Sequence, residues 1–264
     1  MFKAKLFENK VALVTGGGSG IGFAITQQLL QLGATVIICS RKEDRLKAAV
    51  EKLKALSFGE GLGEVAVRYA ICDTREIEQV EALAKNIADH EGKLDILINN
   101  AGGQFPSLAE DISIKGWNAV INNNLNGTWY MTQTMAKTFF FKQKEASIVN
   151  IIANIYRGFP SMAHTGAARA GVENLTMSLA VEWSKHNIQV NAVAPGIIKS
   201  TGLDQYPQEF LKGIEESIPA KRLGTIDEVA YLTLFLCSPM ARFITGETVY
   251  VDGGQRLWGD LFKM

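Results

Sequence analysis

The segment that decides the fold is Val11-Ala-Leu-Val-Thr-Gly16-Gly-Gly-Ser19-Gly20-Ile21-Gly22. Its first four residues are apolar and two of them are β-branched, which predicts a buried strand, and a helical pattern runs from Ile21 to Leu32. The glycines between them permit a tight turn and let backbone N–H groups approach a diphosphate at the helix N-terminus. An ordinary glycine-rich turn can have the same composition. The position of this segment between a strand and a helix nevertheless favours dinucleotide binding.

The rest of the chain alternates short apolar runs with longer helical patterns. Further strands are predicted at 35–39, 65–70, 96–98, 148–152, 188–193 and 248–251, and further helices at 42–56, 76–91, 126–143, 164–185 and 226–237. Continuous apolar strands that alternate with helices indicate a parallel sheet covered on both faces. We therefore predict an α/β fold, with one doubly wound Rossmann-type domain over residues 1–264 and the glycine-containing stretch 57–63 as a connection.

Composition excludes several classes of protein. Hydrophobic residues make up 47% of the 264 residues, which excludes a disordered chain, and 27 basic against 27 acidic residues argue against nucleic-acid binding. No apolar run reaches the ~18 residues of a membrane span. Three scattered cysteines predict no disulfide framework and no metal site. The charged N-terminus and the C-terminal Leu-Phe-Lys-Met lack targeting signals, so we expect a cytoplasmic protein without membrane partners.

The triplet Ser40-Arg41-Lys42 follows the second predicted strand, where a doubly wound fold selects its cofactor. An acidic residue there would bind the ribose 2′-hydroxyl and repel a 2′-phosphate. A hydroxyl and two cations favour the phosphate, which predicts NADPH rather than NADH. The alternative is a solvated basic start to the next helix, although cations at a helix N-terminus oppose the helix dipole.

Further motifs carry a resemblance. They are Asn99-Asn-Ala-Gly102, Asn124, Pro195-Gly196 and Val251-Asp-Gly-Gly254. With the glycine turn, they resemble the short-chain dehydrogenase/reductase family over essentially the whole chain. That resemblance implies strand order 3-2-1-4-5-6-7 and a dimer or tetramer. In the family, the helix that carries the stripe Val172, Leu175, Leu179 and Trp183 packs at a subunit interface, although a stripe alone could also be internal core. The cofactor residues that it and the motifs imply are Gly16, Ser19, Gly20, Ile21, Gly22, Ser40, Arg41, Lys42, Asp73, Asn100, Ala101, Gly102, Arg169, Pro195, Gly196, Ile198 and Ser200.

The catalytic set of that family is broken in this chain. Its tyrosine position holds Thr165 and its lysine position holds Arg169, while its serine falls at Ile152 or Ala153. Only Asn124 survives. A threonine hydroxyl is too weak an acid to replace the phenol, and arginine stays charged and cannot shuttle protons. Arginine can still hold ribose hydroxyls and stabilise a developing oxyanion, so the site is poorly suited to reducing a ketone.

Two subgroups that depart in this way are the peroxisomal trans-2-enoyl-CoA reductases and the 2,4-dienoyl-CoA reductases. The chain resembles the first more closely in Gly102-Gly-Gln-Phe105, Lys115-Gly-Trp117, Gly158-Phe-Pro160 and His164-Thr-Gly-Ala-Ala-Arg-Ala-Gly-Val172. The resemblance implies NADPH-dependent reduction of the C=C bond of a trans-2-enoyl or 2,4-dienoyl thioester, carried on coenzyme A or acyl-carrier protein, in fatty-acid metabolism. Asn124, Thr165 and Arg169 are expected to stabilise the oxyanion or hold the ribose.

The proton donor to Cα stays open between Tyr156 and water. Tyr156 follows the fifth predicted strand on a loop expected to face the nicotinamide, but a loop tyrosine with its hydroxyl in water is an equal alternative. Two rival functions also stay open. One is a carbonyl or 3-oxoacyl reductase with an atypical donor, and the other is a non-catalytic NADPH-binding sensor or scaffold.

Overall fold

A computed structural model describes residues 2–56, 66–143, 145–200, 202–203 and 212–257. Seven parallel strands form one sheet in the order β3-β2-β1-β4-β5-β6-β9, which confirms the predicted order with β9 as the seventh strand. The strands are β1 (Val11–Thr15), β2 (Thr35–Ser40), β3 (Val67–Ile71), β4 (Ile96–Asn99), β5 (Ala146–Ile151), β6 (Ile188–Pro195) and β9 (Thr248–Val251). The predicted connection 57–63 and the first residue of the predicted third strand, Val65, lie outside the described residues.

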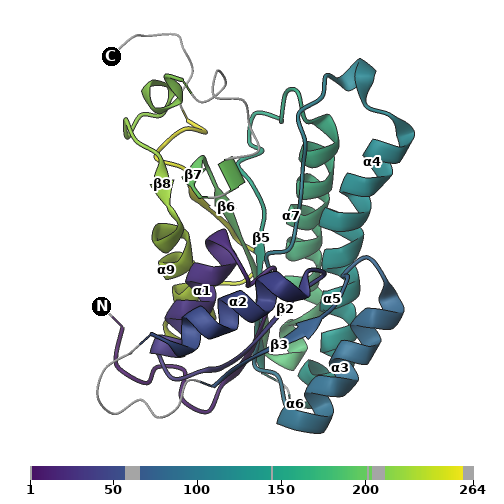
Figure 1. Cartoon of the computed structure of the whole chain (residues 1–264), viewed down its shortest axis with the longest axis vertical. Coiled ribbons are helices and arrows are strands. Elements are labelled where there is room, and N and C mark those ends of the chain that lie inside the picture. Colours follow the sequence, from purple (N-terminus) through teal and green to yellow (C-terminus); the bar gives the residue numbers. More distant parts are fainter. Residues whose placement is uncertain (1, 57–65, 144, 201, 204–211, 258–264) are drawn as a thin grey trace.

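Helices cover both faces of the sheet (Figure 1). One layer contains α1 (Gly20–Gln31), α2 (Glu43–Lys54) and α9 (Ile226–Cys237), and the other contains α3 (Ile77–Glu91), α5 (Gly127–Met135) and α7 (Ala163–Trp183). The layers follow from strand alternation, because successive side chains point to opposite faces of a sheet. Val14, for example, packs with α1 and α9, while its neighbour Leu13 packs with the α3–α5–α7 layer.

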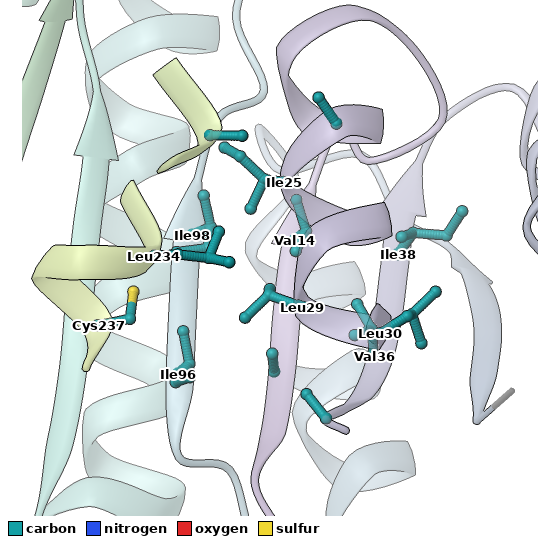
Figure 2. Close-up of a cluster of buried hydrophobic side chains, with 14 of the residues drawn as sticks. Val14, Ile25, Leu29, Leu30, Val36, Ile38, Ile96, Ile98, Leu234 and Cys237 are labelled. Carbon is teal, nitrogen blue, oxygen red and sulfur yellow. The ribbon is translucent and has the colours of Figure 1, made fainter. Parts of the chain in front are cut away.

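Figure 2 shows how the first of these layers is packed. Val14, Ile38 and Ile98 project from three neighbouring strands toward α1 and α9 and are fully buried. Ile25 and Leu29 of α1 meet them, and fully burying one such side chain stabilises the fold by about 1.5–3 kcal/mol. This packing fixes α1 against β1 and so holds the glycine turn between them.

Two parts of the fold were missing from the sequence prediction. The first is α4 (Ile114–Ile121), which begins where the Ser113 hydroxyl accepts a hydrogen bond from the Gly116 N–H at 3.0 Å. It continues through a π-helical segment, η2 (Asn122–Asn126), into α5. The second is the pairing of β7 (Ile198–Lys199) with β8 (Gly224–Thr225), because two-residue strands carry no periodic signal.

Of the two interpretations of the apolar stripe on α7, the structure supports internal core and contradicts a subunit interface. Val172, Leu179 and Trp183 are buried inside the chain, where they pack against the sheet and the neighbouring helices. The exposed apolar residues of α7 are instead Met177 and Val181, on another face of the helix. An apolar stripe with helical spacing marks the buried face of a helix, whatever covers that face.

Candidate active site

One cavity lies at the carboxyl ends of β1 to β4, where a doubly wound sheet places its ligand. It is a cleft of about 250 Å³. The structure brings a large group of the predicted cofactor residues together here: Gly16, Ser19, Ser40, Arg41, Lys42, Asp73, Asn100, Ala101 and Gly102. Residues that follow four separate strands therefore line the same cleft, as expected for a dinucleotide-binding site.

Hydrogen bonds and close backbone packing shape the glycine turn. The Thr15 hydroxyl accepts from the N–H groups of Asn100 at 2.9 Å and Ala101 at 2.8 Å, and the Asn100 amide donates to the Thr15 carbonyl at 2.9 Å. Gly22 has no room for a side chain, since a Cβ there would lie 2.4 Å from the Gly16 carbonyl oxygen. The turn therefore sits directly on the end of β4.

The N-terminus of α1 has no side-chain cap. Ser19 occupies the N-cap position without a capping hydrogen bond from its side chain. Uncapped N–H groups at a helix N-terminus bind anions, because the helix dipole places partial positive charge there. Ser19 also lines the cleft, so this helix end is available to a diphosphate.

Basic side chains gather at the β2 end of the cleft. Arg41 and Lys42 line it together with Arg45 of α2, and no described carboxylate forms an ion pair with any of the three. The sequence analysis missed Arg45, which lies in the first turn of α2, three residues after Lys42 at the N-cap position. These cations favour an anionic group beside Ser40.

Asp73, which follows β3 in the wall of the cleft, adds little free negative charge. Both of its carboxylate oxygens accept hydrogen bonds from Arg75, at 2.5 to 3.1 Å. The Arg75 guanidinium holds the pKa of the Asp73 carboxyl below its usual range. Because Arg75 neutralises this carboxylate, the cleft stays favourable to a phosphate despite the acid in its wall.

The second cavity has a volume of about 680 Å³ and lies over the ends of β5 and β6. Its lining includes the predicted residues Ile21, Arg169, Pro195, Gly196, Ile198 and Ser200. Gly20 faces the same segment, since a Cβ there would lie 3.9 Å from the Ser200 Cβ. The lining residues missed from the sequence are Gln104, Asn154, Arg157, Gly158, Phe159, Met162, Ile197, Gly202, Leu203, Ile214, Ser217, Gln255 and Arg256, while Ile152 and Ala153 were noted only as the serine position. No tyrosine, histidine, lysine, aspartate or glutamate lines this cavity among the described residues.

Arg169 stands at the inner end of this cavity and is 8% exposed. One Nη donates to the Ile151 carbonyl at 2.8 Å, and the buried Nε has no partner among the described residues. Burial lowers the pKa of the guanidinium to about 10, so it remains charged at neutral pH. A buried cation without a carboxylate partner is costly, which indicates a site that a ligand completes.

Gly102 joins the two cavities. A Cβ on Gly102 would lie 2.3 Å from Arg169 Nη2 and 2.7 Å from Asn124 Oδ1. Only glycine leaves space for the guanidinium at this point. Since Gly102 lines the first cleft and Arg169 lines the second cavity, their contact places a fixed positive charge where the two cavities meet.

Asn124 is buried beside Arg169, but its amide is already occupied. Its Nδ2 donates to the Gly103 carbonyl and the Val120 carbonyl, each at 2.8 Å, and its Oδ1 accepts from the Gly103 N–H at 3.2 Å. With both N–H groups in use, the amide has no donor left for a substrate oxygen. The geometry gives Asn124 a different task, which is to hold the Gly102–Gly103 backbone in place.

Thr165 is also buried and lines neither cavity. Its N–H donates to His164 Nδ1 at 2.9 Å, and its hydroxyl lies 3.4 Å from the same nitrogen. The His164 ring packs edge-on against Phe105, with ring centroids 4.6 Å apart. Thr165 therefore lies at the start of α7, one turn before Arg169. Its hydroxyl is next to His164 and reaches neither cavity.

The structure does not bring Tyr156 to the other three predicted catalytic residues. Its side chain is 63% exposed, and its ring packs edge-on against Tyr250 with centroids 6.3 Å apart. It is absent from the lining of the large cavity, although Asn154 and Arg157 on either side of it are present. The loop turns this phenol outward, toward β9.

The fold and the site define a class of protein, an oxidoreductase that binds a nicotinamide dinucleotide. Residues 16–256 match a family model described as "Enoyl-(Acyl carrier protein) reductase". The chain is 36% identical over 255 residues to the probable 2,4-dienoyl-CoA reductase of Bacillus subtilis, covering 95% of this chain and 98% of the relative. It is 35% identical to the 3-oxoacyl-[acyl-carrier-protein] reductase FabG of Thermotoga maritima, covering 94% and 98%.

A solved structure is similar to this chain in both fold and sequence. The citronellol catabolism dehydrogenase AtuB of Pseudomonas aeruginosa is 38% identical, with a TM-score of 0.86 over 97% of this chain and 98% of that one. The chain belongs to the short-chain dehydrogenase/reductase family. In the described part of the chain, no helix could cross a membrane and no group of three or more His, Cys, Asp or Glu side chains could hold a metal ion.

Proposed function

We propose that this protein is an NADPH-dependent reductase that acts on the C=C bond of a trans-2-enoyl or 2,4-dienoyl thioester. The observation that carries the proposal is the chemistry of the large cavity. Its described lining offers a fixed cation, Arg169, and no side chain of suitable acidity to protonate a carbonyl oxygen. The likeness to a probable 2,4-dienoyl-CoA reductase supports the same reaction class.

The cleft residues would hold the cofactor in a defined orientation. The turn at Gly16 and Ser19 would bind the diphosphate, and Arg41, Lys42 and Arg45 would bind a 2′-phosphate, which is the basis for NADPH in place of NADH. Arg169 would reach a ribose hydroxyl from the junction of the cavities. When bound, NADPH supplies a hydride to an acceptor carbon.

Reduction of an enoyl thioester moves negative charge to the thioester oxygen. The Arg169 N–H groups that face the cavity would stabilise that enolate, since a preorganised charge in a buried site needs no reorganisation. Water in the cavity would then protonate Cα, because Tyr156 lies outside the lining. Asn124 and Thr165 serve as positioning residues: Asn124 holds the backbone beside Arg169, and Thr165 holds the first turn of α7.

The rival function is reduction of a 3-oxoacyl thioester, favoured by the likeness to FabG. That reaction needs a positioned acid that delivers a proton to oxygen as hydride arrives. The described lining of the cavity holds no such group. A non-catalytic NADPH sensor is the second rival, and any turnover excludes it.

The deciding experiment follows NADPH oxidation with three thioesters of one acyl length: trans-2-enoyl, 2,4-dienoyl and 3-oxoacyl. We expect turnover of an enoyl or dienoyl substrate and at least about tenfold lower kcat/KM for the 3-oxoacyl substrate. Vigorous 3-oxoacyl reduction without enoyl or dienoyl turnover would overturn the proposal. NADPH binding without turnover of any of the three would favour the sensor.

We also propose that the protein is cytoplasmic and that it forms a homodimer or a homotetramer. Met177 and Val181 of α7 are exposed, and the segment after exposed Phe243 packs beside them at Gly246. This apolar face suits a second copy of the chain. The three buried free cysteines are consistent with a reducing compartment. Light scattering after size-exclusion chromatography measures the oligomer, and a monomer would contradict it.

A further inference from the structure

We propose that Arg157 and Arg256 form a phosphate site at the mouth of the large cavity, where they bind the phosphate groups of a coenzyme A thioester. This inference rests on the proposed function and adds the carrier that the enzyme recognises. Both arginines line the cavity that also contains Arg169. Arg157 is exposed and Arg256 is half-buried, so they lie toward solvent while Arg169 lies inside.

The two arginines come from distant parts of the chain, and the structure joins them directly. Arg157 follows β5 and donates through Nε to the Arg256 carbonyl, which follows β9, at 3.0 Å. The Arg256 guanidinium lies over the ring of Tyr250, with Cζ 4.4 Å from the ring centroid. That stacking fixes the orientation of the planar group without using its N–H donors.

The Arg157 guanidinium is hydrogen-bonded to the backbone of Arg256, and both side chains line the same cavity. Among the described residues, no ion pair joins either guanidinium to a carboxylate. The nearby Asp252 is occupied: its carboxylate accepts from Asn154 Nδ2 at 3.1 Å, the Gly254 N–H at 2.9 Å and the Arg256 N–H at 2.8 Å. Free guanidinium donors therefore remain, and bidentate recognition of phosphate is what they do best.

The cavity combines an apolar wall with positively charged side chains, which suits a ligand that has an apolar chain and an anionic head group. Ile152, Phe159, Met162 and Leu203 give it an apolar wall, and its described charged residues are all arginines. An acyl chain suits the apolar wall, and a polyphosphate suits the mouth. A neutral thioester without phosphates would leave the two outer arginines without a counter-charge.

A small carrier fits this mouth better than an acidic protein carrier. Glu215 and Glu216 are exposed on η6 (Ile214–Ser217), whose first and last residues line the cavity. A protein with an acidic surface would meet these carboxylates as it approached. Coenzyme A can place its phosphates on the arginines without covering that segment, so acyl-carrier protein becomes an outcome of the test.

The test compares one enoyl group on coenzyme A with the same group on pantetheine, which lacks the nucleotide and its phosphates. In the Arg157→Gln/Arg256→Gln double variant we expect KM for the CoA thioester to rise about tenfold or more, with kcat little changed. Kinetics with the pantetheine thioester should match those of the unmodified enzyme. Lys185→Gln, an exposed cation in η4 (Ser184–His186), serves as the matched control and should change neither substrate.

A binding measurement separates this inference from the proposed reaction. Enzyme saturated with NADP⁺, which blocks the nucleotide cleft, is titrated with acetyl-CoA and with S-acetylpantetheine by calorimetry. We expect tighter binding of acetyl-CoA that weakens with salt, and loss of that advantage in the double variant. Equal acetyl-CoA affinity in both proteins would overturn the phosphate site, whether or not any thioester is reduced.

Two further outcomes distinguish a protein carrier from coenzyme A, and the phosphate site from the proposed reaction. If the double variant loses turnover with an acyl-carrier-protein thioester but retains it with the CoA thioester, the arginines serve a protein carrier and the inference is wrong. If the unmodified enzyme reduces no enoyl or dienoyl thioester yet shows the expected calorimetry, the phosphate site stands and the proposed reaction fails. The single variant Arg157→Gln, which leaves the Arg256–Tyr250 stack intact, should show a smaller loss and guards against misfolding of the double variant.

Discussion

The charges at the amino ends of the central strands are paired, whereas Arg169, beside the carboxyl end of β5, has no carboxylate partner among the described residues. At the amino ends of β1, β4 and β5, Lys10 pairs with Asp95 at 3.0 Å and with Glu145 at 3.2 Å. Arg242 pairs with the same Glu145, and Lys93 pairs with Asp95 at 3.3 Å. At the carboxyl ends, Arg169 is buried with one hydrogen bond to a backbone carbonyl and no described carboxylate partner.

We expect the paired charges to contribute to the stability of the fold and the unpaired charge to contribute to function. Charges that pair within the chain tie strand ends together, and their loss destabilises the folded state. A charge left unpaired inside the fold costs stability, so its retention makes physical sense where a ligand supplies the counter-charge or hydrogen-bond acceptor. The amino ends of the strands should therefore respond to mutation through stability, and the carboxyl ends through binding and turnover.

Arg169→Met gives the sharpest test of the carboxyl end. Methionine fills much of the space of the arginine stem without its charge, so kcat/KM should fall ~10²-fold or more, and NADPH binding should weaken. Because the change removes a buried charge, the melting temperature should stay equal or rise. Enzyme assays, cofactor titration and thermal unfolding measure the three quantities.

Arg169→Lys serves as the companion variant. Lysine keeps the charge but not the planar set of donors, so it should retain part of the cofactor affinity. It should not reduce a 3-oxoacyl thioester, because Thr165 is buried against His164 and cannot act as the missing acid. A large drop in melting temperature for Arg169→Met would instead place Arg169 among the stabilising residues.

Asp95→Asn tests the amino end. The Asp95 carboxylate also accepts a hydrogen bond from the Val11 N–H at 2.9 Å, so its charge supports the start of β1 as well as two lysines. We expect a loss of ~1–3 kcal/mol in the free energy of unfolding, measured by denaturant titration. kcat and KM should stay within twofold, and a selective loss of activity at unchanged stability would erase the contrast between the two ends.

Arg41→Ala sharpens the account of the first cleft. We proposed that Arg41, Lys42 and Arg45 bind a 2′-phosphate, with Arg41 as the main contact. On that proposal the unmodified protein should bind NADPH at least ~10-fold more tightly than NADH, which is ~1.4 kcal/mol. The substitution should remove most of that gap and leave the affinity for NADH unchanged. Equal dissociation constants for the two cofactors in the unmodified protein would contradict this assignment.

The sequence was most informative where a function depends on local chain geometry. The glycine turn and the first cleft follow from a strand–turn–helix signal and from residues at strand ends, which meet at one edge of a parallel sheet. The strand order was implied by the resemblance to the short-chain dehydrogenase/reductase family, and the structure confirms it. The Arg157–Arg256 contact joins residues 99 positions apart, so no local pattern contains it. Asn124 was identified by position, but its occupied amide emerges only once Gly103 and Val120 are placed around it.

Tyr156 provides the smallest expected effect and the most direct check on the large cavity. From sequence it was one of two candidate proton donors, because it follows β5 on a loop near the active site. The structure stacks its ring against Tyr250, leaves it 63% exposed and places it outside the cavity lining. Tyr156→Phe keeps that ring contact and removes only the hydroxyl, so kcat should change less than twofold. A true general acid would instead lose ~10²-fold or more. A loss of that size at unchanged melting temperature would mean that the loop turns inward when substrate binds, and it would return the proton-donor role from water to Tyr156.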